Sequence, residues 1–329
     1  MQVLHITRPG GPEVLALAER PAPTPTGAEL LVRVRATALN RADLLQLQGA
    51  YPAPPGTPAD VAGLEYAGEV LAVGPQARRF QVGDRVMGLV GGGAFSEQLV
   101  THEREALHVP KGLDFAQAAA LPEAYLTAFD ALVLQGGLRM GETVLIHAVA
   151  SGVGSAAAQI CRAMGVRTLG TGRGAHKLAR ASEWGVDRTL LCDASPPRFA
   201  DEVKKATDGR GVDLALDLVG GDYLPETLRA MALQGRVLLV GLVAGRQADV
   251  SLEVVLTRRL RVTGTVLRSR PPEEKMALVQ AAERSLLPLF QSRALVPVVD
   301  AVYPMKQAQE AFTRMARNDT VGKLVLQWE

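Results

Sequence analysis

The chain has 329 residues, of which 47% are hydrophobic and 4% aromatic, and its formal net charge is +2. Such a length can bury a substantial core and is sufficient for two domains. The weak charge and the few aromatic residues argue against a nucleic-acid partner. The sequence has no run of about 18 apolar residues and no signal-peptide pattern near Met1, so we expect no membrane association and a cytoplasmic location.

Cys161 and Cys192 are the only two cysteines. Two cysteines are too few for a disulfide framework or a zinc ribbon. We therefore expect both to be small residues of the core or of a helix.

Residues 1–121 contain short β-type runs that are separated by Gly and Pro. These runs span residues 30–36, 69–73, 85–89 and 95–100. Short strands at such spacing are typical of a compact, β-rich, barrel-like domain. The proline-rich stretches at 21–27 and 51–58 are expected to be ordered loops.

Residues 143–165 read as a strand, a tight turn and a helix without a spacer. The apolar run Val144 to Ile146 is typical of a strand that is covered on both faces of a parallel sheet. The small residues that follow allow the backbone to approach an anion at the start of a helix. The glycine fingerprint of a dinucleotide site is imperfect, because Val149 and Ser151 replace its first two glycines. A tight strand-to-helix turn without a ligand is the alternative.

Strands and helices alternate on both sides of this turn as far as residue 267, which predicts a doubly wound parallel sheet. The predicted strands are 167–171, 189–191, 212–217, 236–240 and 261–267, and the predicted helices are 116–121, 122–134, 175–184, 199–207 and 223–232. A helix at 273–286 and strands at 296–299 and 323–327 are expected to return to the first domain. The expected domains are therefore 1–121 with 268–329, and 122–267.

Several spaced motifs carry a family resemblance. Gly63-Leu-Glu65, Gly68-Glu-Val70 and Val82-Gly-Asp-Arg-Val86 resemble the signature of the medium-chain dehydrogenase/reductase superfamily. Further segments resemble its zinc-free, zeta-crystallin-type quinone oxidoreductases, closest to the tumour-suppressor-inducible branch: 38–44, 48–51, 122–129, 146–154 and 267–270. The resemblance spans the chain and implies a Rossmann nucleotide-binding domain plus a β-rich, GroES-like catalytic domain.

The zinc enzymes of that superfamily need cysteine and histidine ligands that this chain lacks. Asn40 and Leu64 stand at two of the ligand positions, and no cysteine precedes Cys161. We therefore expect no metal, and an acceptor that is easily reduced. Glu65 either belongs to a buried or interdomain ion pair, which we favour, or takes part in catalysis.

Cofactor choice is predicted from the end of the second strand of the alternating series. NAD-binding folds place an acidic residue there, whereas cations favour NADP. The stretch after Leu169 has no acid but contains Arg173 and Lys177, and Lys177 falls on the 2′-phosphate lysine of the resembling family. The family's tyrosine near that phosphate is replaced by Cys192. We expect NADPH, with two solvated surface charges as the alternative.

The resemblance implies further contacts. The residues expected to line the pyrophosphate and nicotinamide are Thr127, Ser151, Gly152, Val153, Gly154 and the 241–245 loop with Gly241, Leu242 and Val243. Val219 is expected beside the ribose. Asn40, Asp43 and Tyr51 fall on residues at the nicotinamide end, where Asn and Tyr can orient an acceptor carbonyl. Alternatively, Asn40 and Asp43 only cap or brace a loop, and Tyr51 only packs it.

These expectations combine into an NADPH-dependent, metal-free quinone oxidoreductase with a small-molecule substrate. One alternative is reduction of an activated C=C bond in enals, enones or enoyl thioesters. Another is a cofactor-binding protein with a structural or RNA-binding role. Because residues 235–241 and 261–267 read as the last, apolar strands of the sheet, a homodimer through that edge is expected.

Overall fold

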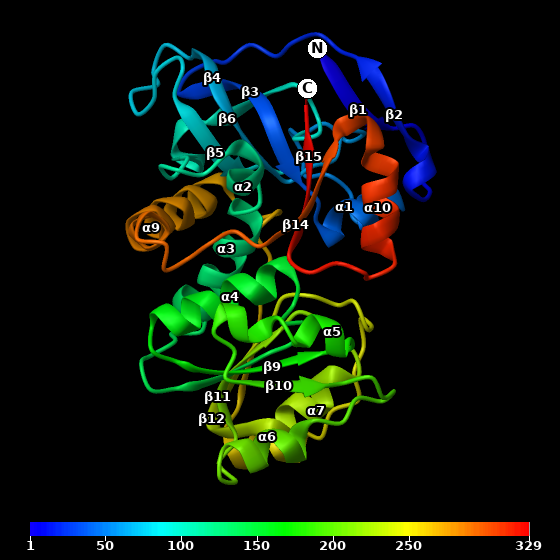
Figure 1. The fold of residues 1–329 in the computed structure, drawn as a ribbon, viewed down its shortest axis with the longest axis vertical. Coiled ribbons are helices and arrows are strands. Elements are labelled where there is room, and N and C mark those ends of the chain that lie inside the picture. Colours follow the sequence, from blue (N-terminus) through cyan, green and yellow to red (C-terminus); the bar gives the residue numbers. More distant parts are fainter. Residues whose placement is uncertain (329) are drawn as a thin grey trace. The chain divides into compact units, whose positions relative to one another are not determined.

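The computed structural model describes residues 1–328 and divides the chain into two compact units (Figure 1). Unit 1 comprises Met1–Leu126 together with the chain from Leu267 onward, and unit 2 is Thr127–Val266. Residues 122–126, which we expected in the nucleotide-binding domain, thus fall in unit 1. No helix among the described residues is long and apolar enough to cross a membrane.

Unit 2 contains a sheet of six parallel strands in the order β10-β9-β8-β11-β12-β13. The strands are β8 (Thr143–Ile146), β9 (Arg167–Gly172), β10 (Arg188–Leu191), β11 (Val212–Asp217), β12 (Met231–Leu239) and β13 (Arg261–Gly264). The first strand, β8, lies at the centre, and the chain reverses its direction of winding after β10. This is the predicted doubly wound sheet, with a ligand-binding switch point at the carboxyl ends of its central strands.

Helices connect the strands of unit 2 and cover both faces of the sheet, with α4 on one side of β9 and β10 and α6 and α7 on the other (Figure 1). They are α4 (Gly152–Ala163), α5 (Ala175–Leu178), α6 (Ala200–Ala206), α7 (Tyr223–Ala230) and α8 (Leu252–Arg258).

The predicted single helix 175–184 is wrong. It is α5 followed by a 3-10 helix, Ala181–Trp184. Residues three apart align in a 3-10 helix, so its tighter winding places both Ala181 and Trp184 on the buried side. The last strand is also shorter than predicted, since β13 ends at Gly264. The N–H of Thr265 still donates to the Leu239 carbonyl oxygen at 3.0 Å, and its hydroxyl donates to Asp130 at 2.9 Å.

Unit 1 is built on a seven-stranded sheet with the order β14-β15-β3-β4-β5-β7, and β6 pairs with β3. A separate antiparallel pair is formed by β1 and β2. The strands are β1 (Gln2–Ile6), β2 (Leu15–Glu19), β3 (Glu29–Ala38), β4 (Glu65–Val73), β5 (Arg85–Leu89), β6 (Gln98–His102), β7 (Ala106–His108), β14 (Val299–Pro304) and β15 (Lys323–Gln327). The helices are α1 (Arg41–Leu47), α2 (Phe115–Ala119), α9 (Pro272–Gln291) and α10 (Ala308–Ala316), and α3 (Pro122–Phe129) begins in unit 1 and ends in unit 2.

The C-terminal strand β15 holds the ends of unit 1 together. It pairs antiparallel with β3 and parallel with β14, so residues 325–327 lie beside residues 36–38. The predicted strand 323–327 is confirmed. The predicted strand 296–299 is wrong in its bounds, since β14 begins only at Val299, and the predicted run 95–100 forms a strand only from Gln98.

Several elements of unit 1 were not predicted, among them β1, β2, α1 and α10. Each is short or carries a mixed pattern, so its local signal is weak. They are stabilised by a shared core in which Phe95 and Phe312 pack edge to face, 5.8 Å between ring centroids.

Residue 68, which belongs to the family motif, must be glycine in this sheet for a steric reason. It lies in β4 opposite Val34 of β3, where the register shifts. A β-carbon at residue 68 would lie 1.9 Å from the carbonyl oxygen of Arg33, which is a backbone atom that cannot rotate away. Only glycine therefore allows β3 and β4 to approach this closely.

Candidate functional site

The turn from β8 to α4 has the geometry of an anion-binding helix start. Ser151 caps α4, because its hydroxyl oxygen accepts the backbone N–H of Gly154 at 3.1 Å. A β-carbon on Gly154 would lie 2.5 Å from the carbonyl oxygen of Ala148. The turn therefore requires glycine at 154, whereas Ser151 replaces a fingerprint glycine by supplying a cap. Gly152 and Val153 form the first turn of the helix, with positive partial charge at its end.

Two cations follow the carboxyl end of β9, as the sequence predicts. Arg173 is exposed directly after the strand, and Lys177 is partly buried on α5. Cys192, which replaces the family tyrosine, is buried, and its backbone N–H bonds the carbonyl oxygen of Gly172 at 2.8 Å. Cys192 cannot supply the tyrosine hydroxyl of the resembling family. Arg173 and Lys177 are the cations that follow β9.

Val219 and the 241–245 loop lie together at the carboxyl end of β11. One carboxylate oxygen of Asp217 accepts the N–H groups of Val219 and Gly220, at 2.9 and 2.8 Å. The N–H of Ala244 bonds the carbonyl oxygen of Val219 at 2.9 Å, and a β-carbon on Gly241 would lie 2.3 Å from the Leu218 carbonyl oxygen.

The 241–245 loop, which was expected to line the cofactor, exposes two apolar side chains. Leu242 is 47% exposed and Val243 is 55% exposed. Exposed apolar groups of this kind can cover a flat ring or contribute to an interface.

Thr127 supplies an unsatisfied polar group. Its side chain is buried, and its hydroxyl oxygen has no hydrogen-bond partner among residues 1–328. Buried polar atoms without a partner are rare in folded proteins and need an explanation, such as a bound ligand or water. Thr127 is thus suited to the cofactor contact that the resemblance implies.

His147 is a fully buried residue next to β8 whose structural role the sequence did not reveal. Its two ring nitrogens lie 2.8 Å from the hydroxyls of Thr171 and Thr227. The Thr227 hydroxyl donates to the carbonyl oxygen of Tyr223, so Nε2 of His147 must donate to Thr227 and Nδ1 must accept from Thr171. Burial lowers the pKa of His147, which keeps it neutral. This clamp ties the ends of β8 and β9 to α7.

In unit 1, Asn40 belongs to a buried ionic network. The Lys323 ammonium lies 2.6 Å from Oε1 of Glu65, both side chains being more than nine-tenths buried, and it also donates to Oδ1 of Asn40 and the carbonyl oxygen of Leu39. The amide nitrogen of Asn40 donates to Glu65 at 2.9 Å and to the Ala38 carbonyl at 3.2 Å. The expected buried ion pair of Glu65 is confirmed, and its partner Lys323 lies within the same unit.

Asp43 is fully buried and braces the start of α1. Its carboxylate accepts the backbone N–H groups of Asn40 at 2.7 Å and of Gly63 at 3.1 Å. Burial raises the pKa of Asp43 to about 6, although both hydrogen bonds and the charges of Lys323 and Arg268 oppose that rise. The side-chain polar groups of Asn40 and Asp43 are therefore all hydrogen-bonded within the protein. This agrees with the alternative that the two residues cap or brace a loop.

Tyr51 is half-buried against Arg268. The guanidinium carbon lies 4.9 Å from the centre of the Tyr51 ring, and Arg268 donates to the carbonyl oxygens of Gly91 and Tyr51, at 2.7 and 3.3 Å, and to Oε1 of Gln46 at 2.6 Å. The phenol oxygen has no hydrogen bond to the described residues. Burial raises the pKa of Tyr51, so the hydroxyl keeps its proton at neutral pH.

Glu123 adds a second carboxyl beside this network. Its backbone N–H donates to Oε2 of Glu65 at 2.8 Å, while its own side chain is only partly buried. Burial, and then the charge of Glu65, raise the pKa of Glu123 to about 7.

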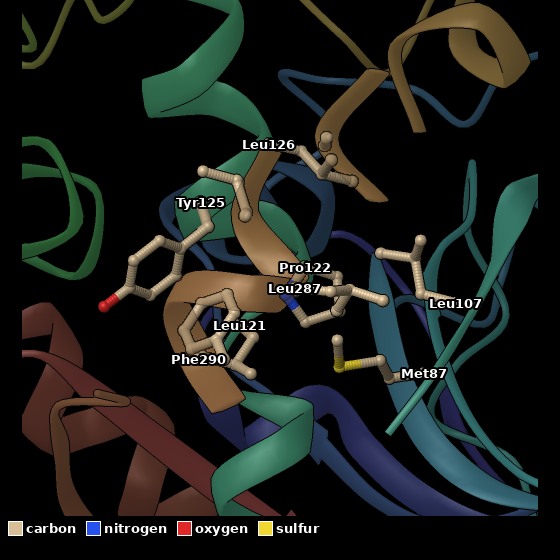
Figure 2. A pocket seen from close by; sticks show the side chains of 10 residues that line it. Met87, Leu107, Leu121, Pro122, Tyr125, Leu126, Leu287 and Phe290 are labelled. Atoms are coloured by element: carbon tan, nitrogen blue, oxygen red, sulfur yellow. The ribbon is translucent and has the colours of Figure 1, made fainter. Parts of the chain in front are cut away.

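A small apolar cavity lies between α3, α9 and the strands of unit 1 (Figure 2). It has room for about one water molecule, about 20 Å³, and Met87, Leu107 and Phe290 are among its lining side chains. None of the predicted site residues lines it. It is a packing gap and carries no chemistry.

Among the described residues, no group of three or more His, Cys, Asp or Glu side chains could hold a metal ion. Leu64 is buried next to Glu65, and Asn40 faces the Lys323 ammonium. Of the two positions that hold zinc ligands in the resembling zinc enzymes, residue 40 therefore binds an ammonium group in this chain, and residue 64 is a buried leucine.

Comparison with known proteins gives a consistent assignment. Residues 26–111 match the family model described as an alcohol dehydrogenase GroES-like domain, and residues 152–284 match the model described as a zinc-binding dehydrogenase. A quinone oxidoreductase of Pseudomonas aeruginosa is 36% identical over 321 residues, which cover 96% of each chain.

Two solved structures share the fold along the whole chain. The Escherichia coli quinone oxidoreductase complexed with NADPH has a TM-score of 0.88 and 28% identity, with 99% of this chain and all of the other covered. The CurK enoyl reductase has a TM-score of 0.87 and 28% identity, with 100% and 99% covered.

Loss of the Lys323 ammonium is predicted to destabilise unit 1 strongly. Lys323→Met leaves the fully buried Glu65 carboxylate without its counter-charge, at an expected cost of about 3–5 kcal/mol in the free energy of unfolding. Urea unfolding measures this loss. Lys323→Met combined with Glu65→Leu removes both charges and should recover part of the stability. A loss below about 1 kcal/mol in the single variant would contradict the assignment.

Proposed function

This chain belongs to the medium-chain dehydrogenase/reductase superfamily, among its quinone oxidoreductase-like members, and we propose that it reduces quinones or related conjugated carbonyls with NADPH. The observation that carries the proposal is the Lys323 ammonium bound to Glu65 and Asn40, because Asn40 and Leu64 stand at positions where the resembling zinc enzymes have metal ligands. Without a Lewis acid, hydride transfer suits acceptors that stabilise their own negative charge. Quinones are such acceptors, and the Pseudomonas aeruginosa relative carries that activity in its name.

The residues of unit 2 fit NADPH. Ser151, Gly152, Val153 and Gly154 would hold the pyrophosphate at the start of α4, because the first N–H groups of a helix attract an anion. The unpartnered hydroxyl of Thr127 would gain a partner from the cofactor.

The remaining cofactor contacts are proposed from the positions of the predicted residues. Arg173 and Lys177 would bind the 2′-phosphate, Val219 would lie beside the ribose, and the loop of Gly241, Leu242 and Val243 would cover the nicotinamide. The cofactor supplies the hydride. The protein holds it in place and excludes water from the reacting groups.

On the acceptor side, we assign different roles to the three predicted residues. The hydroxyl of Tyr51, which has no other partner in the described chain, would donate a hydrogen bond to the acceptor carbonyl. Asn40 and Asp43 hold the loop and α1 in place, since their polar groups are already engaged. They are positioning residues in this proposal.

Reduction of an activated C=C bond is the second candidate. It is favoured by the full-length structural likeness to the CurK enoyl reductase, and it needs the same cofactor and the same acceptor hydrogen bond. A structural or RNA-binding role is the weakest reading, because the net charge is only +2.

The deciding experiment is NADPH oxidation by the purified chain with a panel of quinones and a panel of enones and enoyl thioesters. We expect the highest kcat/KM with quinones, and no change in activity or thermal stability after treatment with EDTA. Activity that is lost with the chelator and restored by zinc would refute the metal-free mechanism.

Cofactor preference is predicted to depend on Arg173 and Lys177. A charge-assisted contact to phosphate contributes about 1.5–3 kcal/mol, so Arg173→Ala or Lys177→Ala should raise the Kd for NADPH by roughly one to two decades. The Kd for NADH, which lacks the phosphate, serves as the internal control and should barely change. Equal weakening of both cofactors in calorimetry would rule out a 2′-phosphate contact.

Tyr51→Phe tests the acceptor contact. It keeps the ring under the Arg268 guanidinium but removes the hydroxyl, so turnover should fall while the Kd for NADPH and the Tm stay near wild type. The loss should be larger for an enone than for a quinone. Tyr51→Ala, which also removes the ring, should lower the Tm. Unchanged rates for Tyr51→Phe with both acceptor classes would show that the residue only packs the loop.

We also propose a homodimer through the edge strand β13 of unit 2. Val262 on that strand and the nearby Leu252, Leu256 and Val266 are 45–77% exposed, an unusual amount of apolar surface beside an open sheet edge. Light scattering should give twice the chain mass at micromolar concentration, and Val262→Asp should shift the species toward a monomer. A monomer mass for the wild-type chain would refute the proposal.

A further inference from the structure

A polar recess of about 230 Å³ lies on unit 2 near the amino ends of β12 and β13. It is lined by residues of the 134–139 loop and of these two strands, all of which belong to unit 2. Its volume is more than ten times that of the apolar cavity in unit 1, which is about 20 Å³. Three arginines line it, and Leu134 and Leu238 are the only apolar side chains among the lining residues.

The register of β12 and β13 places two of these arginines side by side. Arg236 of β12 pairs with Arg261 of β13, and Leu238 pairs with Thr263. Residues two apart in a strand point to the same face, so these four side chains lie on one face of the sheet. Like charges directly opposite each other in neighbouring strands are destabilising. An anion bound between the two guanidinium groups would remove that repulsion.

The third arginine is carried by the loop that follows the π-helix Asp130–Gln135, which packs against β11 and β12. A β-carbon on Gly136 would lie 2.6 Å from the side chain of Leu214 and 2.7 Å from a backbone carbonyl oxygen of the π-helix. Only glycine therefore lets the chain run this close to the sheet. The loop then brings Arg139 to the recess.

Arg236 is held in place by a carboxylate of its own unit. One of its terminal nitrogens lies 2.7 Å from both carboxylate oxygens of Glu142, and the backbone N–H of Arg139 donates to the same carboxylate at 2.9 Å. The Arg236 side chain is 19% exposed, and its Nε is buried without a hydrogen-bond partner in the described chain. A buried donor without a partner needs an explanation, such as a bound ligand or water.

The recess carries more positive charge than the surrounding carboxylates neutralise. Glu142 is paired with Arg236. The side chains of Arg139 and Arg261 form neither a hydrogen bond nor an ion pair with residues 1–328, and both are exposed. Two guanidinium groups therefore line the recess without a counter-charge from the described chain.

The other acidic groups nearby have partners outside the recess. Asp213 pairs with Arg210 at 2.6 Å. Asp130 is buried, accepts from the hydroxyl of Thr265 at 2.9 Å, and does not line the recess. Neither carboxylate is placed to neutralise the two arginines.

We propose that this recess binds a small phosphate-bearing molecule, with Arg139 and Arg261 pairing with the phosphate group and Nε of Arg236 donating to it. Guanidinium groups match phosphate geometry through parallel N–H groups, and such charge-assisted bonds are stronger than neutral ones. The volume is below the range of about 300–1,000 Å³ that is typical of sites for drug-sized ligands, so the occupant is smaller than a dinucleotide.

This site is separate from the proposed cofactor site. The residues assigned to the cofactor in unit 2 follow the carboxyl ends of β8, β9, β11 and β12, whereas the recess lies near the amino ends of β12 and β13. No lining residue of the recess belongs to the predicted cofactor or acceptor contacts. The inference therefore does not depend on the proposed reduction.

The test is calorimetric titration of the purified chain with inorganic phosphate and with glycerol phosphate, in the presence of saturating NADPH. NADPH occupies the cofactor site, so the probes cannot bind there. We expect saturable binding of both probes with a Kd below about 1 mM. Sodium chloride at the same ionic strength should give only the heat of dilution.

Arg139→Gln and Arg261→Gln each remove one contact and should weaken phosphate binding roughly 10- to 100-fold, the usual effect of losing a charge-assisted bond. The fold should persist, because both side chains are exposed and lack partners in the described chain. The Kd for NADPH should stay as in wild type.

Arg167→Gln is the matched control for these two variants. Arg167 is an exposed arginine at the start of β9, at the same end of the sheet, and does not line the recess. It removes the same charge and should bind phosphate as wild type does. Arg173→Ala, at the proposed 2′-phosphate contact, should likewise leave phosphate binding in the presence of NADPH unchanged.

Two results would overturn the inference. If the double variant Arg139→Gln with Arg261→Gln binds phosphate as tightly as wild type, or if wild type binds neither probe, these arginines are solvated surface charges. The double variant should also keep the wild-type mass in light scattering. A lower mass, together with no phosphate binding by wild type, would assign the arginines to a contact between two copies of the chain.

Discussion

A single buried ion pair, Lys323 with Glu65, fixes the relation between the two ends of unit 1. The ammonium comes from the first residue of β15 and the carboxylate from the first residue of β4. The Lys323 nitrogen lies 2.6 Å from Oε1 of Glu65, so the ion pair links two strands that are far apart in sequence. Such a pair is stable only if each remaining lone pair and proton is satisfied. Asn40, the Leu39 carbonyl and the Glu123 backbone satisfy them, and in doing so they position the start of both α1 and α3.

The fold could be predicted where the local pattern suffices. The strands 212–217 and 323–327 have the predicted ends, and the small-residue turn after β8 leads directly into α4 as predicted. Short elements such as β1 and α10 were missed, because a few residues of mixed character acquire structure only through contacts with Phe312 and its neighbours. The 3-10 helix at Ala181–Trp184 was likewise decided by burial of its side chains.

The residues of the candidate site that belong to local sequence motifs could be predicted, whereas those contributed by distant parts of the chain could not. Motif spacing brought out Asn40, Glu65 and the cations after β9. Arg268 belongs to one of the resembling segments, 267–270, but its contact with Gln46 could not be predicted, and neither could the contact of Lys323 with Asn40, since the partners are 222 and 283 residues apart. Only the folded chain shows that these two cations complete the site.

The burial of both cysteines bears on survival in the presence of the proposed acceptors. Quinones and enones are electrophiles that alkylate accessible thiolates. Cys161 and Cys192 are buried, and burial raises the pKa of the first thiol to about 12 and of the second to about 11. Thiols in that state are almost entirely protonated and unreactive. Neither cysteine therefore offers a reactive thiolate to such acceptors.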